Sequence, residues 1–144
     1  MEDIKKIMED VKEIINKPEF IVGVIFGVIS SIPYINYCCC LLYVLSGVIS
    51  AHIKSKEGDL SDEEYLDCGG LSGIVAGLTT SFLDYYLNFT TPMEDYHYPG
   101  NYGGVLLSLI IRPIFFIIFF IIYLSVGTIF GAIGGIIYGK LKNR

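Results

Sequence analysis

Long apolar stretches separated by short polar ones run along this chain, and the pattern predicts helices inside a membrane. The longest, residues 114–139, contains no Lys, Arg, Asp or Glu. A helix over these residues would rise roughly 39 Å, which is enough to cross a hydrocarbon core of about 30 Å with some tilt. We therefore predict a transmembrane helix over 114–139.

Apolar residues recur at helical spacing within residues 1–17, with Lys, Glu and Asp between them. The apolar set is Ile4, Ile7, Met8, Val11, Ile14 and Ile15. This pattern predicts an amphipathic helix that Pro18 ends. Its apolar face is expected in the membrane interface or against the other helices, and a partner helix in the cytoplasm is the alternative.

Residues 20–53 form an uncharged run that is too long for one span, because a single helix would extend roughly 51 Å. Pro33 and Asn36 interrupt the run, so we expect it to divide into transmembrane helices over 20–33 and 37–53. Each is near the minimum of about 17 residues for a span. Two full spans and a re-entrant hairpin, which enters and leaves on the same side, both remain open.

The next polar loop ends in the sequence SDEE at residues 61–64, which has the form of a capping box. The following helix is therefore expected to begin near Asp62 and to span the membrane over 66–88. Farther along, Arg112 and Pro113 interrupt the last apolar segment. Because proline cannot donate to the helix ladder, we expect a kink or a break at Pro113.

The basic residues predict how the chain is oriented in the membrane. Of the ten Lys and Arg residues, all but Arg112 fall on one side when four spans are assumed. Cytoplasmic loops carry an excess of Lys and Arg, so both termini are expected in the cytoplasm. The predicted fold is one all-α domain over 1–144, an integral protein of the cell membrane with four transmembrane helices plus the N-terminal amphipathic helix.

Composition narrows the function classes. Charged residues make up 17% of the chain and apolar ones 53%, whereas soluble domains carry about 25% charge. No basic patch with interleaved aromatic residues occurs, which argues against nucleic-acid binding. No nucleophile elbow, P-loop or HExxH motif appears, so we expect neither an enzyme nor a cofactor.

The cysteines do not have the spacing of a metal site. They are Cys38, Cys39, Cys40 and Cys68. Adjacent positions on a helix point about 100° apart, whereas a tetrahedral site needs converging ligands. We expect small buried apolar residues here and no bound metal.

Glycines four residues apart form rows on three of the predicted helices. The rows are Gly23 and Gly27, then Gly69, Gly73 and Gly77, then Gly127, Gly131, Gly135 and Gly139. Such rows share one helix face and let a second helix approach closely. They are expected to pack helices within one chain, and packing between the chains of a homo-oligomer is the alternative.

A short internal repeat accompanies these rows. Gly23, Gly27, Ser30 and Ser31 recur fifty residues later as Gly73, Gly77, Thr80 and Ser81. The repeat predicts two helical hairpins that run in the same direction, related by an axis along the membrane normal. Small residues are common in membrane helices, so chance is the other explanation.

Asp84 and Arg112 are the two charges that this arrangement places at membrane depth. At 1.5 Å per residue, both fall roughly 6–10 Å below the outer surface. Because a charge inside a span is costly and usually faces a partner or water, we predict a salt bridge between them. In two open alternatives, Arg112 lines a polar cavity and binds an anionic group, or extends to the lipid headgroups.

The segment from Gly27 to Gly47 contains Pro33, Asn36 and the adjacent cysteines. It resembles a P-x-x-N-x-C-C segment in small uncharacterised prokaryotic multi-pass membrane proteins, which also continue with a charged loop and a glycine-rich third helix. The resemblance covers roughly the first eighty residues. The resemblance implies this helical architecture and a prokaryotic membrane, and it assigns no active site. Separately, the Ile- and Lys-rich composition of the chain suits an archaeal source.

Two functional classes follow from these observations. The first is a structural or interaction protein that helps to assemble or regulate a membrane complex. The second is a small oligomeric transporter or channel with a polar site at Asp84 and Arg112. The expected partners are the lipid bilayer and either further copies of the chain or another membrane protein.

Overall fold

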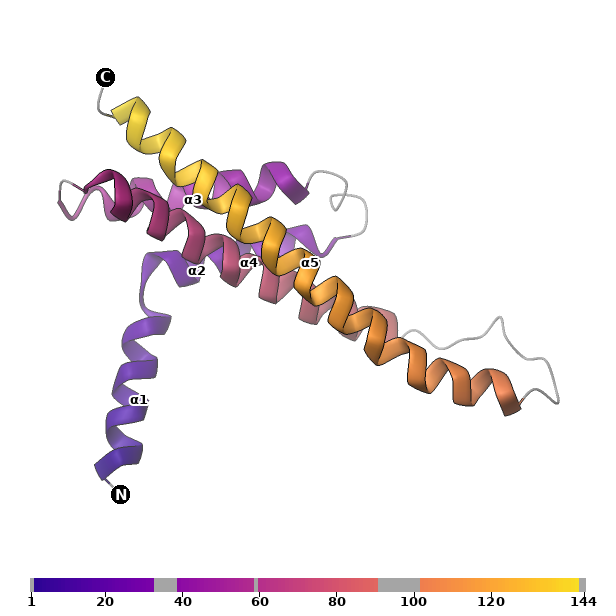
Figure 1. Ribbon diagram of the computed structural model, residues 1–144. Coiled ribbons are helices and arrows are strands. Elements are labelled where there is room, and N and C mark those ends of the chain that lie inside the picture. Colours follow the sequence, from indigo (N-terminus) through magenta and orange to yellow (C-terminus); the bar gives the residue numbers. More distant parts are fainter. Residues whose placement is uncertain (1, 33–38, 59, 91–101, 143–144) are drawn as a thin grey trace.

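The computed structural model describes residues 2–32, 39–58, 60–90 and 102–142, and the side chains within 4–32, 40–58, 60–87 and 113–142. The helices are α1 (Glu2–Ile15), α2 (Pro18–Ser30), α3 (Cys39–Lys54), α4 (Asp62–Thr90) and α5 (Tyr102–Lys142). All secondary structure in these ranges is helical, which confirms the all-α prediction. Figure 1 shows α2 to α5 gathered in one elongated bundle from which α1 departs.

The beginning of α4 follows the prediction from its capping box. The backbone N–H of Ser61 donates to Oε2 of Glu64 at 2.7 Å, and the backbone N–H of Glu64 points back to the Ser61 hydroxyl at 3.4 Å. These two bonds satisfy donors that the first turn leaves without intrahelical partners. The helix begins at Asp62, as expected.

Of the predicted kink or break at Pro113, the break is wrong, and a kink stays a prediction. Residues 102–142 form one continuous helix of 41 residues with Pro113 inside it. A proline removes only one backbone donor, while a break would leave several backbone groups without partners in hydrocarbon. Continuing the helix therefore costs less than ending it, and the last helix extends well beyond the predicted 114–139.

The bundle helices differ in length. Two of the described helices are long and apolar enough to cross a membrane, over Asp62–Leu87 and Pro113–Lys142. By contrast α2 has 13 residues and α3 has 16, so they rise only ~20 Å and ~24 Å against a hydrocarbon core of about 30 Å. The division of residues 20–53 into two helices agrees with the prediction, and four full spans stay a prediction.

The two hairpins, α2–α3 and α4–α5, run in the same direction, as the internal repeat predicted. Gly23 of α2 lies against Ser72 of α4, and Gly27 lies against Ala76, so these helices are parallel. Meanwhile α3 and α4 each contact every other helix of the bundle. They therefore form its middle, with α2 and α5 outside them.

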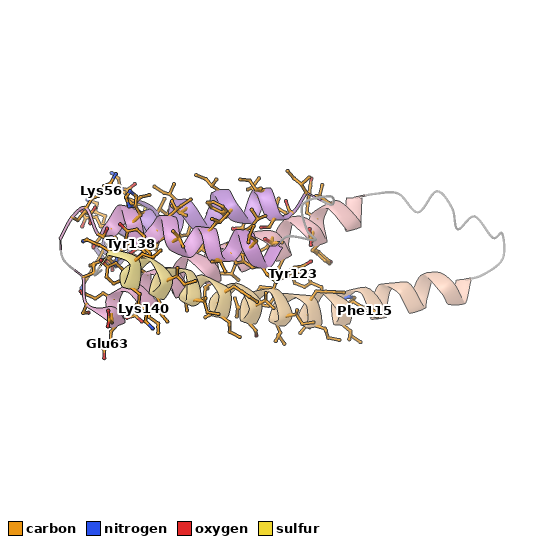
Figure 2. All side chains as sticks on the ribbon, turned by 90° about the horizontal axis from the view of Figure 1, so that it is seen from above. Lys56, Glu63, Phe115, Tyr123, Tyr138 and Lys140 are labelled. Atoms are coloured by element: carbon orange, nitrogen blue, oxygen red, sulfur yellow. The ribbon has the colours of Figure 1, made fainter. Side chains whose placement is uncertain are left out.

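One end of the bundle gathers most of the charges. Figure 2 shows Lys56, Glu63 and Lys140 at this end. The first turn of α2, with Glu19, and the last turn of α3, with Lys54, also lie there. We call this region the charged end.

The bundle divides into two halves along its length. In the four-helix half, α2 and α3 pack on residues 65–80 of α4, and α3 also packs on residues 123–142 of α5. In the two-helix half, residues 81–87 of α4 and 113–122 of α5 continue beyond them, away from the charged end (Figure 2). The two halves also differ in the side chains between their helices, which are small in the four-helix half and aromatic in the two-helix half.

Candidate functional site

Backbones touch along the α4–α5 interface. A Cβ placed on Gly77 would lie 2.5 Å from the carbonyl oxygen of Tyr123, and one on Gly73 would overlap the carbonyl of Gly127. Gly69 meets Gly131 and Gly135 in the same way. No side chain fits between these helices, so glycine at each position is a requirement of the packing.

The other interfaces of the four-helix half use glycine in the same manner. A Cβ on Gly23 would lie 2.6 Å from the carbonyl oxygen of Ser72, and a Cβ on Gly27 would lie 2.7 Å from that of Ala76. Gly139 lies under the ring of Tyr65. The glycine rows named from the sequence thus lie against neighbouring helices of the same chain.

Sequence reasoning missed two further glycines on the α3–α5 interface. A Cβ on Gly47 would overlap the carbonyl of Gly131, and one on Gly134 would overlap that of Val44. Neither glycine belongs to a row with a spacing of four, which is why the pattern did not reveal them. By contrast, a Cβ on Gly70 would meet only the Ala132 side chain at 3.9 Å.

Hydroxyl groups fill the centre of the four-helix half. Between α3 and α4, the hydroxyls of Ser46 and Ser72 lie 3.4 Å apart, and Oγ of Ser50 lies 3.1 Å from Sγ of Cys68. All four side chains are fully buried. These contacts join the two central helices through polar groups that are also small enough for close packing.

A third contact of this kind lies nearer the end of α2. The Tyr43 hydroxyl donates to Oγ1 of Thr80 at 3.2 Å, and Oγ1 of Thr80 lies 3.1 Å from the carbonyl oxygen of Gly27. Thr80 also bonds the carbonyl of Ala76 within its own helix. Three helices, α2, α3 and α4, therefore meet at one buried hydroxyl.

An ion pair closes the charged end of the α2–α3 hairpin. Nζ of Lys54 donates to Oε1 of Glu19 at 2.6 Å, and the Glu19 side chain is only 5% exposed. Burial alone would raise the pKa of the Glu19 carboxyl, but the hydrogen bond and charge of Lys54 outweigh it and hold that pKa below its ordinary value. The same hydrogen bond raises the pKa of Lys54.

The sequence contained a signal for this pair. Glu19 is the last charged residue before the uncharged run and Lys54 is the first one after it. When such a run folds back as a hairpin, its two ends meet. The charges also complement the helix dipoles, with the acid in the first turn of α2 and the base in the last turn of α3.

Asp84 lies in the two-helix half, partly buried. The hydroxyl of Tyr123 donates to its Oδ2 at 2.9 Å. The neighbouring Tyr85 ring lies 4.4 Å from that of Phe116, which sets residue 84 level with residue 116 of α5. Position 112 is one helical turn farther from the charged end, but the Arg112 side chain lies outside the described residues, so the Asp84–Arg112 pair stays a prediction.

The remaining polar side chains do not converge on a metal. Among the described side chains, no three His, Cys, Asp or Glu groups gather as a metal site requires. Cys68 is buried but Cys40 is exposed, so the expectation of buried cysteines is wrong for Cys40. His52 contacts the Tyr138 hydroxyl through Nδ1 at 2.8 Å, and Ser55 lies 3.2 Å from the same hydroxyl.

Comparison with known proteins supports the resemblance drawn from the sequence. Uncharacterized protein MJ1491 of Methanocaldococcus jannaschii is 37% identical over 62 residues, which is 43% of this chain. The matched part is 42% of that relative's length. No solved structure matches the chain.

A family model described as the MJ1491 transmembrane domain matches residues 16–144. The match includes α2 to α5 and leaves out α1. It confirms the expected link to a small, uncharacterised family of membrane proteins. The chain belongs to the MJ1491 transmembrane domain family.

Proposed function

We propose that this chain is a multi-pass protein of the cell membrane, with both termini in the cytoplasm, that acts as a structural or assembly component of a membrane complex. The backbone contact between α4 and α5 carries this proposal. Glycines and buried hydroxyls make the four-helix half a closely packed body in which the Ser46 and Ser50 hydroxyls of α3 lie against Ser72 and Cys68 of α4. A rigid body of this kind suits the support of other membrane proteins better than turnover of a substrate.

The test is a scan for protein neighbours in native membranes. A photo-crosslinking amino acid is placed at exposed positions around the bundle, such as Ile25 of α2, Leu71 of α4 and Ile129 of α5. A partner chain of one defined mass, captured from one face and not from the others, is the expected result. Capture from no face would contradict the proposal.

A second candidate function, transport, is favoured by the carboxylate of Asp84 within α4. Its bond to Tyr123 places a polar group in the two-helix half, and intramembrane acids commonly mark ion or substrate paths. In this case Arg112 and Asp84 would form a polar site for an anionic solute. The competing proposal is that they form a salt bridge that only joins α4 to α5.

Water access at position 112 distinguishes a polar transport site from a salt bridge that only joins the two helices. Arg112→Cys is made in a background that lacks the four native cysteines and is treated with a membrane-impermeant thiol reagent. Labelling would show that water reaches the site and would call for flux measurements with anionic solutes. Full protection in both right-side-out and inside-out vesicles, with labelling intact at Lys56→Cys in the inside-out vesicles, would count against transport.

A further inference from the structure

The helix α1 is separate from the bundle. Its described side chains are all exposed, and among the other helices it contacts mainly α2. Six large apolar side chains are 47–63% exposed: Ile4, Ile7, Met8, Val11, Ile14 and Ile15. Exposed apolar surface of this extent marks an interaction site.

These apolar side chains share one face of α1. At about 100° per residue they fall within an arc of roughly 120°, and Lys, Glu and Asp occupy the remainder. An apolar stripe of this width with a fully charged opposite face is typical of a helix that lies in a membrane interface.

The connection to α2 keeps α1 near the membrane surface. Only Asn16 and Lys17 separate the two helices, and the uncharged run begins at Phe20. The link is itself ordered, because the N–H of Lys17 donates to the carbonyl of Ile14 at 3.2 Å and that of Phe20 to Lys17 at 3.0 Å. Such a short link fixes the C-terminal end of α1 at the bilayer surface.

The direction of α1 agrees with this position. Figure 1 shows α1 running crosswise to the long helices of the bundle and leaving from the beginning of α2. Helices that cross the membrane follow the bundle axis, so a crosswise helix at the charged end runs along the membrane surface. The alternative is that α1 forms a coiled coil with a second copy of the chain, parallel to the bundle axis. In that arrangement α1 would have to turn away from the direction that it has here.

The net charge of α1 determines whether anionic lipid headgroups attract it. Residues 2–15 carry five acidic side chains and three lysines, which is a net charge of −2. Anionic headgroups attract basic side chains by about 1 kcal/mol each, so they offer this helix no net attraction. The apolar face must supply the binding.

We propose that α1 lies in the boundary between lipid headgroups and acyl chains, held by its apolar face and not by attraction to anionic lipid. Its acidic face then points to the aqueous phase. This inference does not depend on the role of the bundle proposed above. The family match begins at residue 16 and so does not include α1.

The test uses the full chain in vesicles of phosphatidylcholine. Single cysteines are introduced along α1, after the native cysteines are replaced, and are labelled with a nitroxide. Access to oxygen, which concentrates in acyl chains, is compared with access to a water-soluble nickel chelate. We expect Ile7→Cys, Val11→Cys and Ile14→Cys to favour oxygen, and Glu9→Cys and Glu13→Cys to favour nickel.

Two reference positions calibrate the measured access to oxygen and to nickel. Ile129→Cys on the exposed side of α5 gives the value for the acyl region, and Lys56→Cys gives the value for water. Equal access to nickel at Val11→Cys and Lys56→Cys would overturn the proposal, since α1 would then lie in water. Immobile labels that neither reagent reaches, with spin–spin broadening between chains, would overturn it in favour of a second copy.

Lipid composition tests the charge argument separately. Adding phosphatidylglycerol to the vesicles should leave the oxygen preference at Val11→Cys unchanged within about twofold, because α1 carries no net positive charge. A preference that appears only with the anionic lipid would overturn the claim that the apolar face supplies the binding.

Discussion

The four-helix half and the two-helix half pack their helices with side chains of very different size. Where four helices meet, glycines and hydroxyl residues bring backbones into contact, as at Gly73 and Gly127. Where α4 and α5 continue alone, aromatic rings lie between them, with Phe82 6.1 Å and Tyr85 4.4 Å from the ring of Phe116. Small residues suit a centre that many helices share, and large rings give one pair enough contact area.

This comparison implies different sensitivities. In the four-helix half an added methyl group has nowhere to go, so enlargement should do the damage. In the two-helix half the rings border exposed surface, as the 59% exposure of Phe82 shows, and lost polar contacts should matter more there.

The largest effect is expected from Gly69→Ala. Its new Cβ would overlap the carbonyl of Gly131 and lie 2.9 Å from the N of Gly135, so the helices must separate. We expect the free energy of unfolding to fall by about 2–3 kcal/mol, measured by thermal unfolding in detergent micelles with circular dichroism.

The adjacent glycine is the matched control. Gly70→Ala makes the same chemical change one position along the same helix, where the new Cβ meets only ordinary contact at 3.9 Å. A gain in helix propensity of up to about 1 kcal/mol is then the main effect. Equal losses at Gly69 and Gly70 would show that backbone contact does not limit the four-helix half.

The next effect is expected at the charged end. Lys54→Met removes the cation that compensates the buried Glu19 carboxylate, and we expect a loss of about 2 kcal/mol, reduced from the fully buried case because Lys54 is 34% exposed. Lys56→Met is the control, since the same change is made on an exposed side chain. Adding Glu19→Gln to Lys54→Met should recover part of the loss, and no recovery would mean that the carboxylate was not the cause.

A smaller effect is expected when a hydroxyl group is removed, and here the two-helix half should lose more stability than the four-helix half. Tyr123→Phe removes the hydrogen bond to the Asp84 carboxylate in the two-helix half, and we expect a loss of about 1.5 kcal/mol. Tyr43→Phe in the four-helix half leaves Thr80 still bonded to the carbonyl of Ala76, so its cost should be about 0.5 kcal/mol. Thermal unfolding of both variants decides the order, and a larger loss for Tyr43→Phe would refute it.

The smallest effect concerns pH. The pKa of Glu19 is held below its ordinary value of 4.5, so its pairing stabilises the fold above that value and is lost as the pH falls through the folded pKa. The pKa of Lys54 is raised above 10.5, so its contribution is present below that value and lost as the pH rises through the folded pKa. Unfolding midpoints should fall in acid by a smaller amount in Glu19→Gln than in the wild type.

Much of the fold was readable from local chemistry. The capping box located the beginning of α4 because its two hydrogen bonds need only residues three apart. The division of residues 20–53 followed from length, and the direction of the hairpins followed from the repeat. These signals are encoded within one helix or one turn.

The features that sequence reasoning missed all depend on contacts between helices. Nothing local marks Ser46 as the partner of Ser72, because most helical serines can also bond a carbonyl of their own helix. Gly47 and Gly134 have no partner at a spacing of four. The break predicted at Pro113 was wrong for the opposite reason, since a local rule against proline in helices does not account for the cost of open backbone groups in lipid.

The spacing of the glycine rows on α4 and α5 has a consequence for folding. Rows that repeat every four residues do not fix their own register, because sliding α5 by one turn along α4 sets glycine against glycine again. Side chains at their two ends break this degeneracy: the ring of Tyr65 rests on Gly139, and the Tyr123 hydroxyl donates to Asp84. A one-turn slip would push the Tyr65 ring toward Gly135, where the backbones already touch. The tyrosines therefore act as register marks, and their removal should create alternative, misaligned bundles instead of an unfolded chain.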